Sequence, residues 1–142
     1  MRYKDLNELL ISEGCNPNTF SIGQSQHESI CIVKKDSQWL VYYSERGRDQ
    51  APLYTSESEE AACDYFYTKV VQQQHWHIVG FFRNREDADN LVKLLHSYSI
   101  NHIRNDIPAY KDENDPRYRV FVIGKDIFKY TELFGTPQVN YT

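Results

Sequence analysis

The 142-residue sequence lacks the short motifs that mark the common nucleotide-binding and hydrolytic sites. It contains no GxGxxG, no P-loop, no GxSxG and no HExxH. Cysteine is also scarce: Cys15, Cys31 and Cys63 are odd in number, widely spaced and outside any CxxC pattern. Such cysteines are typical of reduced thiols packed in a core. These absences predict a protein that is not an enzyme and requires neither a cofactor nor a metal.

The sequence also lacks a long apolar run and an excess of basic residues. Residues 1–5 lead into a polar helix, and no segment approaches the length that spans a bilayer, so we expect a cytoplasmic protein without a membrane partner. Sixteen Lys and Arg against twenty Asp and Glu give a net charge of -4. This charge argues against direct binding of nucleic acid by broad electrostatic attraction and favours a basic protein as the partner.

What is present is a series of strand and helix patterns typical of a single α+β domain covering residues 1–142. The patterns predict the order αβββα over residues 1–73 and βαββα over residues 75–134, followed by a loose tail over residues 135–142. About six strands are expected to form one antiparallel sheet, with the helices packed chiefly on one face.

Two segments have apolar side chains on both faces, which predicts interior strands with neighbours on both edges. They are residues 38–46 and residues 76–82. Strand patterns over residues 19–22 and 29–34 precede the first of these segments and are joined to it by short links. The first three strands are therefore predicted to form an antiparallel meander.

Helix ends are indicated by residues with strong capping preferences. Gly14 follows a helical pattern over residues 5–13 and supplies a left-handed stop. Ser56 and Glu59 have the spacing of a capping box, in which each side chain bonds the other residue's backbone NH, so a helix is expected after them. Asn84 is predicted to cap the next helix.

Histidine and cysteine side chains offer a metal site and a nucleophile as alternatives, and either would make the protein a small enzyme. His75 and His77 lie on the same side of a strand and could bind zinc if His96, His102 or a cysteine were brought close. Their spacing matches no known zinc pattern, and isolated His pairs are usually structural. Cys63 could act as a nucleophile beside a histidine base, but its place on the apolar stripe of a helix favours a core role.

Acidic residues gather in the polar connection between the last two predicted strands. They are Asp106, Asp112, Glu113 and Asp115, and Tyr110 lies among them. Polar loops usually face water without a further role. An acidic patch with an aromatic side chain also suits contact with a basic protein, because complementary charge speeds association and rejects wrong partners. These five residues are the predicted partner-binding site.

Two segments of the first half, residues 39–47 and 56–67, carry a resemblance to a known family. They resemble small immunity proteins encoded beside bacterial polymorphic toxins, including those of contact-dependent growth inhibition systems. The resemblance implies a cytoplasmic toxin inhibitor of the toxin-antitoxin kind, without catalytic residues of its own. It would bind one cognate toxin domain, often a basic nuclease, and block its active site or substrate path.

The second half offers an alternative, because its βαββ order resembles that of SPOR-type and split-βαβ domains. In that arrangement the helices cover chiefly one face of the sheet, which leaves the other face or the loops at its ends free for a partner. This resemblance implies a binding module for a small ligand or glycan, without catalysis. An accessible concave apolar pocket would favour this alternative.

Overall fold

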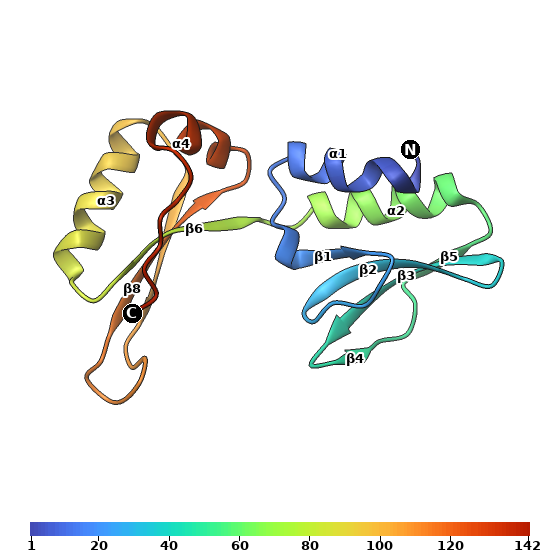
Figure 1. Ribbon diagram of the computed structural model, residues 1–142, viewed down its shortest axis with the longest axis horizontal. Helices are drawn as coiled ribbons and strands as arrows, with labels where there is room; N and C mark the ends of the chain where they lie inside the picture. Colours follow the sequence, from blue (N-terminus) through green and yellow to red (C-terminus); the bar gives the residue numbers. More distant parts are fainter. The chain divides into compact units, whose positions relative to one another are not determined.

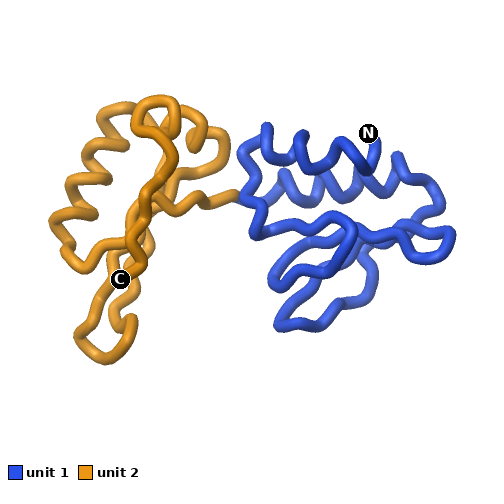
Figure 2. Tube along the Cα trace, viewed as in Figure 1, with its two compact units in different colours: residues 1–74 blue, residues 75–142 orange.

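The computed structural model describes all 142 residues, and the chain divides into two compact units (Figure 2). The first unit is Met1–Gln74 and the second is His75–Thr142. Both combine helices with a β-sheet, so the predicted α+β class is confirmed. The strands form one five-stranded and one three-stranded sheet, so the prediction of a single sheet of about six strands is wrong. Apolar periodicity locates strands, but it does not specify which strands pair.

The first unit places its helices on one face of a five-stranded sheet (Figure 1). Its elements are, in chain order, a 3-10 turn Tyr3–Asp5, α1 Leu6–Ser12, a 3-10 turn Pro17–Thr19, β1 Phe20–Ile22, β2 Ser29–Lys35, β3 Gln38–Glu45, β4 Arg48–Asp49, β5 Tyr54–Ser56 and α2 Glu59–Val71. Strand β3 pairs with β2 on one edge and with β4 and β5 on the other. The prediction of an interior strand at residues 38–46 is therefore confirmed.

Strand β1 runs parallel to β2, with Phe20 opposite Ile30 and Ile22 opposite Ile32. The prediction of an antiparallel meander is therefore wrong for its first strand pair, although β2 and β3 are antiparallel as expected. Parallel strands usually need a crossover of a dozen or more residues. The link over residues 23–28 is shorter because β1 has only three residues, so the chain has little distance to return.

The core of the first unit lies between α2 and the sheet. Helix α2 packs on β2 and β3, and α1 lies beside α2 (Figure 1). Phe66 of α2 is fully buried, and its ring meets that of Phe20 edge to face, with ring centroids 6.4 Å apart. Leu6 and Leu10 of α1 complete this cluster. Burial of these apolar side chains is the main driving force that holds the unit together.

The ends of the helices largely follow the capping predictions. Gly14 has a φ of 78°, the left-handed conformation expected after α1. The side chain of Asn84 accepts a hydrogen bond from the NH of Glu86, as expected for a cap. The predicted capping box at Ser56 is wrong, because Ser58 caps α2 by accepting from the NH of Ala61. Ser56 instead accepts from the NH of Ser58 and so stabilises the turn that leads into the helix.

The second unit has a three-stranded sheet in the order β6-β8-β7. Its elements are, in chain order, β6 Trp76–Phe82, α3 Arg85–Ser97, β7 His102–Ile107, β8 Arg117–Ile123 and α4 Asp126–Phe134. The βαββα order is as predicted, but β8 is the central strand and β6 lies at an edge. The prediction of an interior strand at residues 76–82 is therefore wrong. Apolar side chains on both faces indicate that a strand is covered above and below, but they do not indicate whether it has a neighbouring strand on each edge.

Helices α3 and α4 pack on the same face of this sheet, where Val120 and Val122 of β8 are fully buried. Residues 135–142, predicted as a loose tail, fold back beside the sheet (Figure 1). The ring of Tyr141 lies 5.3 Å from that of Phe81 in β6. The opposite face of the sheet carries no helix, and its side chains include Phe81 and Phe121.

Candidate functional site

The predicted site lies on the β7–β8 hairpin, whose strands hold the acidic connection at both ends. The pairing runs from His102 opposite Val122 to Ile107 opposite Arg117. Beyond the strands, the NH of Tyr110 donates to the main-chain oxygen of Asp115 at 2.8 Å. The structure thus brings all five predicted residues onto one hairpin and fixes the base of their connection.

Two of the predicted acidic residues are paired with arginines of the same hairpin. Asp106 accepts a hydrogen bond of 3.0 Å from Nε of Arg104, and Arg104 also contacts Asp89 of α3. Asp115 accepts a bond of 2.5 Å from Arg117. This hydrogen bond holds the pKa of the Asp115 carboxyl below its usual range. Asp106 and Asp115 therefore have a structural role that the sequence interpretation did not include.

Arg117 is a buried charged side chain, only 1% exposed, that contacts two residues of the connection, Tyr110 and Asp115. Its guanidinium lies 4.8 Å from the centroid of the Tyr110 ring and donates to the main-chain oxygen of Thr142 at 2.7 Å. Its Nε atom is buried without a hydrogen-bond partner. The Tyr110 ring also meets Phe81 edge to face at 5.2 Å. Tyr110 is thus held in place between two side chains and is still 40% exposed.

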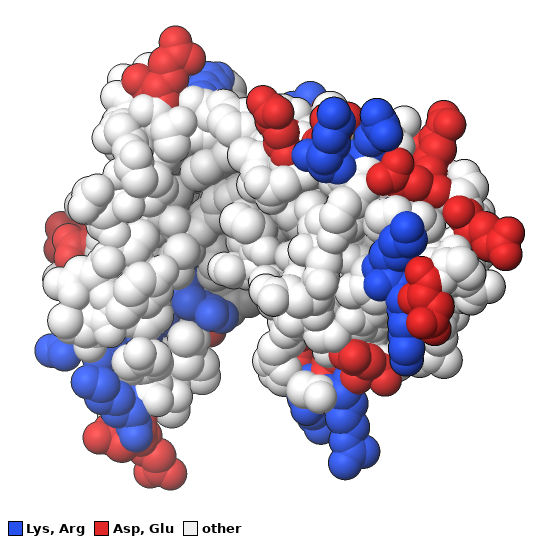
Figure 3. Space-filling view, turned by 45° about the vertical axis from the view of Figure 1, so that its right-hand side comes forward, with Lys and Arg blue, Asp and Glu red and all other residues white.

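Asp112 and Glu113 are exposed in the connection and make no ion pair. Lys111 precedes them, and basic and acidic side chains lie together at the lower end of the second unit (Figure 3). Residues 104–119 contain four basic and four acidic side chains, so the hairpin as a whole is neutral. Of its four carboxylates, those of Asp106 and Asp115 are paired with arginines, and those of Asp112 and Glu113 are not.

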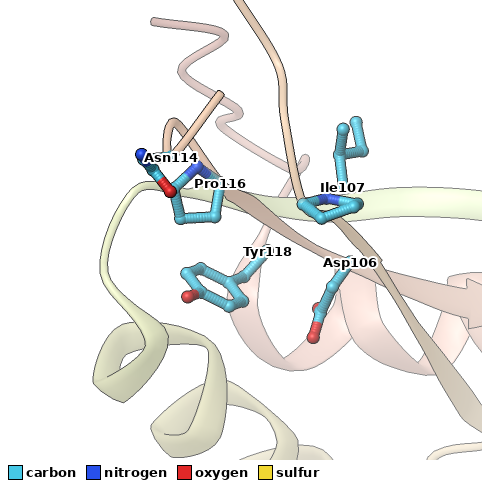
Figure 4. Close-up of a pocket in the computed structure, with 6 residues that line it drawn as sticks. Asp106, Ile107, Asn114, Pro116 and Tyr118 are labelled. Atoms are coloured by element: carbon cyan, nitrogen blue, oxygen red, sulfur yellow. The ribbon is translucent and has the colours of Figure 1, made fainter. Parts of the chain in front are cut away.

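A pocket of about 490 Å³ opens on the hairpin beside this connection (Figure 4). Figure 4 shows the Asp106 carboxylate to one side of the Tyr118 ring and Pro116 above this ring, and Ile107 also lines the pocket. The remaining lining residues are Pro108 and Asn114. The sequence interpretation missed this pocket, although the two prolines that flank the connection signal a constrained loop.

The helix-free face of the second sheet carries aromatic rings and an arginine. The rings of Trp76 and Phe121 lie 5.3 Å apart. The guanidinium of Arg119 lies 5.4 Å from the centroid of the Phe121 ring and donates to both oxygens of Asn105 on the neighbouring strand. The sequence interpretation did not single out this face, because the rings come together only when β6 pairs with β8.

The geometry of the histidine and cysteine side chains supports neither the metal site nor the nucleophile that the sequence offered as alternatives. No group of three or more His, Cys, Asp or Glu side chains lies close enough to bind a metal ion. Cys63 is fully buried, and burial, aided by the nearby Glu59, raises the pKa of its thiol to about 11. A thiol with this pKa is protonated at neutral pH, and only the thiolate is an effective nucleophile.

Comparisons with known proteins identify no relative. No family model matches the chain, and no curated protein or solved structure matches it either. No helix here is both long and apolar enough to cross a bilayer.

Proposed function

We propose that this protein is an immunity protein that binds a cognate toxin domain in the cytoplasm and neutralises it stoichiometrically. The toxin is a basic protein, in keeping with a nuclease that must hold phosphates. The immunity protein covers its active site or substrate path and performs no chemistry itself. The observation that carries the proposal is the β7–β8 hairpin, where exposed carboxylates, a fixed aromatic ring and a pocket lie on one ordered element.

Each part of the hairpin has a role in this proposal. Asp112 and Glu113 are exposed and attract a basic surface before contact, which raises the association rate. Tyr110 is already held by Phe81 and Arg117, so it loses little freedom when it is buried by a partner. The pocket around Tyr118 accepts one side chain of the toxin, as anchor pockets do in most interfaces.

The test is the double variant Asp112→Lys, Glu113→Lys, measured against the toxic product of the adjacent gene. Association rates are recorded by stopped flow over a range of salt concentrations. We expect the rate at low salt to fall by about ten-fold or more, because electrostatic steering contributes about this much. Asp115 is left unchanged because it pairs with the buried Arg117, and its loss would disturb the fold.

The matched control is Glu57→Lys, Glu60→Lys, which makes the same charge change at the exposed start of α2. We expect this control to bind nearly as fast as the natural protein. If the control loses binding and the hairpin variant does not, the interface lies at the start of α2. If neither variant changes the rate or its salt dependence, acidic steering is not part of the function.

A second candidate function is a non-catalytic module for a small ligand or glycan, and both the pocket around Tyr118 and the helix-free face favour it. Binding sites of this kind combine aromatic surfaces with a few polar groups that fix orientation. Here Trp76 and Phe121 supply the rings, while Arg119 and Asn105 supply the polar groups. Titration with soluble peptidoglycan fragments, followed by tryptophan fluorescence, tests this candidate. Saturable binding that is lost in Phe121→Ala supports it, and no fluorescence change up to millimolar ligand contradicts it.

A further inference from the structure

We propose that the outer edge of β6 is a peptide-binding site that the chain's own residues 138–142 occupy. Its ligand class is an extended peptide in which an aromatic residue is followed directly by a main-chain carbonyl or carboxylate oxygen. The site shares Arg117 and Phe81 with the base of the hairpin connection, and it does not depend on the proposed inhibition of a toxin.

The first observation is the position of β6 in the sheet. It pairs with β8 on one side only, so no strand lies along its outer edge. Such an edge is a template for the addition of an extended chain. The βαββα order is that of a split-βαβ arrangement that lacks its last strand, and that strand would lie against β6.

The second observation is what lies at this edge. A space at this edge is lined by residues 138–140 and Thr142 on one side. On the other side it is lined by residues 79–83, which are the end of β6 and the residue that follows it. Residues 138–142 form no strand. Tyr141 places its ring 5.3 Å from that of Phe81. The main-chain oxygen of Thr142 accepts hydrogen bonds from Arg83 at 2.9 Å and from Arg117 at 2.7 Å.

These contacts define the ligand chemistry. Two guanidinium groups converge on one oxygen, and hydrogen bonds from charged donors are about twice as strong as neutral ones. Arg117 is 1% exposed, and its Nε atom has no partner, so the cation is built into the fold rather than held in solvent. Phe81 offers an aromatic contact to the residue before the bound oxygen, since its ring lies 5.3 Å from that of Tyr141. A peptide with an aromatic residue before the bound oxygen can contact the Phe81 ring and accept hydrogen bonds from both arginines.

The third observation is the loose fit of the resident segment. A space of about 390 Å³ remains between residues 138–142, β6, Leu91 of α3 and Tyr130 of α4. The ring of Tyr141 is 56% exposed. Gly135, with a φ of 83°, starts the segment just after α4 and allows the chain to turn there. A segment with so little buried surface is displaced more easily than a paired strand.

The test uses the full chain and a fluorescent peptide with the sequence of residues 135–142, in free-acid and amide forms. The resident segment competes at an effective concentration of about millimolar, so the natural protein should bind the peptide weakly. In Tyr141→Ala the resident segment is weakened, and peptide affinity should rise by about ten-fold or more. Adding Phe81→Ala to that variant should abolish the gain. The free-acid and amide forms distinguish a carboxylate ligand from a carbonyl ligand.

A second variant guards against an effect of Tyr141→Ala on the fold. Glycine in place of Gln138, Val139 and Asn140 loosens the segment without changing Tyr141, and it should also raise peptide affinity. A scrambled peptide should bind neither variant. Equal affinity of the natural protein and both loosened variants for the peptide, or equal binding of the scrambled peptide, would overturn the proposal.

Discussion

The two units differ in charge and in how they cover their sheets. Residues 1–74 contain seven Lys and Arg against eleven Asp and Glu, whereas residues 75–142 contain nine of each. The whole net charge of -4 therefore belongs to the first unit, while the candidate site lies on the neutral second unit. The difference teaches that overall charge describes attraction at long range and does not locate a binding surface.

The two units also differ in what covers the face of each sheet that carries no helix. In the first unit the link over residues 23–28 is bonded to this face, since Ser25 lies 2.5 Å from the hydroxyl of Tyr42 and donates to Asp49 at 2.9 Å. In the second unit the corresponding cover consists of aromatic side chains, since the rings of Tyr110 and Tyr141 lie against Phe81. A cover held by few contacts can exchange with a partner, which is why both proposed surfaces lie on the second unit.

The largest expected effect is on the core of the first unit. Phe66→Ala removes a fully buried ring and should lower the free energy of unfolding by about 3 to 5 kcal/mol. Urea unfolding followed by Trp39 fluorescence, in a Trp76→Phe background, reports this unit alone. Leu53→Ala removes an apolar side chain of the same unit that is 50% exposed and serves as the control. A loss below about 1 kcal/mol for Phe66→Ala would mean that the ring is not part of the core.

The next effect concerns the second unit and its one tightly packed glycine. A Cβ at Gly80 would lie 2.5 Å from the Phe82 ring and 2.9 Å from a methyl group of Leu91. Gly80→Ala should therefore cost about 1 to 3 kcal/mol through overpacking. Unfolding followed by Trp76 fluorescence in a Trp39→Phe background measures this cost. Leu91→Ala makes room, so the combined variant should lose less than the sum of the two single losses; strict additivity would contradict the contact.

A smaller expected effect is a difference between the units in how their stability depends on pH. Burial raises the pKa of Cys15 and of Cys63 from 9.0 to about 11, and both thiols lie in the first unit. Their contribution to stability is complete below pH 9, where the unfolded thiols are protonated, and is lost as the pH rises toward 11. The first unit should therefore weaken between pH 9 and 10, before tyrosines with a usual pKa of 10.0 ionise.

Low pH should lower the stability of the second unit. Hydrogen bonds from Arg104 and Arg117 lower the pKa values of Asp89 and Asp115 below the usual 3.8. Their contribution is present above pH 3.8 and is lost as the pH falls through the lowered values. The two single-tryptophan proteins named above report each unit over the pH range. Identical pH profiles for the two reporters would contradict this difference between the units.

Sequence reasoning located most elements but not their pairing. The interior position of β3 follows from its two apolar faces, and the start of α3 follows from the capping preference of Asn84. The parallel pairing of β1 and the edge position of β6 depend on contacts between distant segments, which local periodicity does not encode. The elements that were misplaced are those whose neighbours come from elsewhere in the chain.

The candidate site was predicted in part for the same reason. The connection between the last two strands was located correctly, with Asp112 and Glu113 exposed in it. The pairing of Asp106 and Asp115 with arginines was missed, although Arg104 lies two residues before Asp106 in β7 and so on the same side of that strand. Asp115 precedes β8, so its pairing with Arg117 depends on the path of the connection. The pocket around Tyr118 and the ring pair of Trp76 and Phe121 depend on tertiary packing, which the sequence pattern does not reveal.

The most direct test of the account is co-expression of this protein with the toxic product of the adjacent gene, together with titration calorimetry of the two purified proteins. The account predicts restored growth and a complex with one copy of each protein. It also predicts that Asp112→Lys, Glu113→Lys weakens protection while keeping its fold, because both side chains are exposed. A toxic neighbour whose activity is unaffected, with no heat of binding, would contradict the central claim.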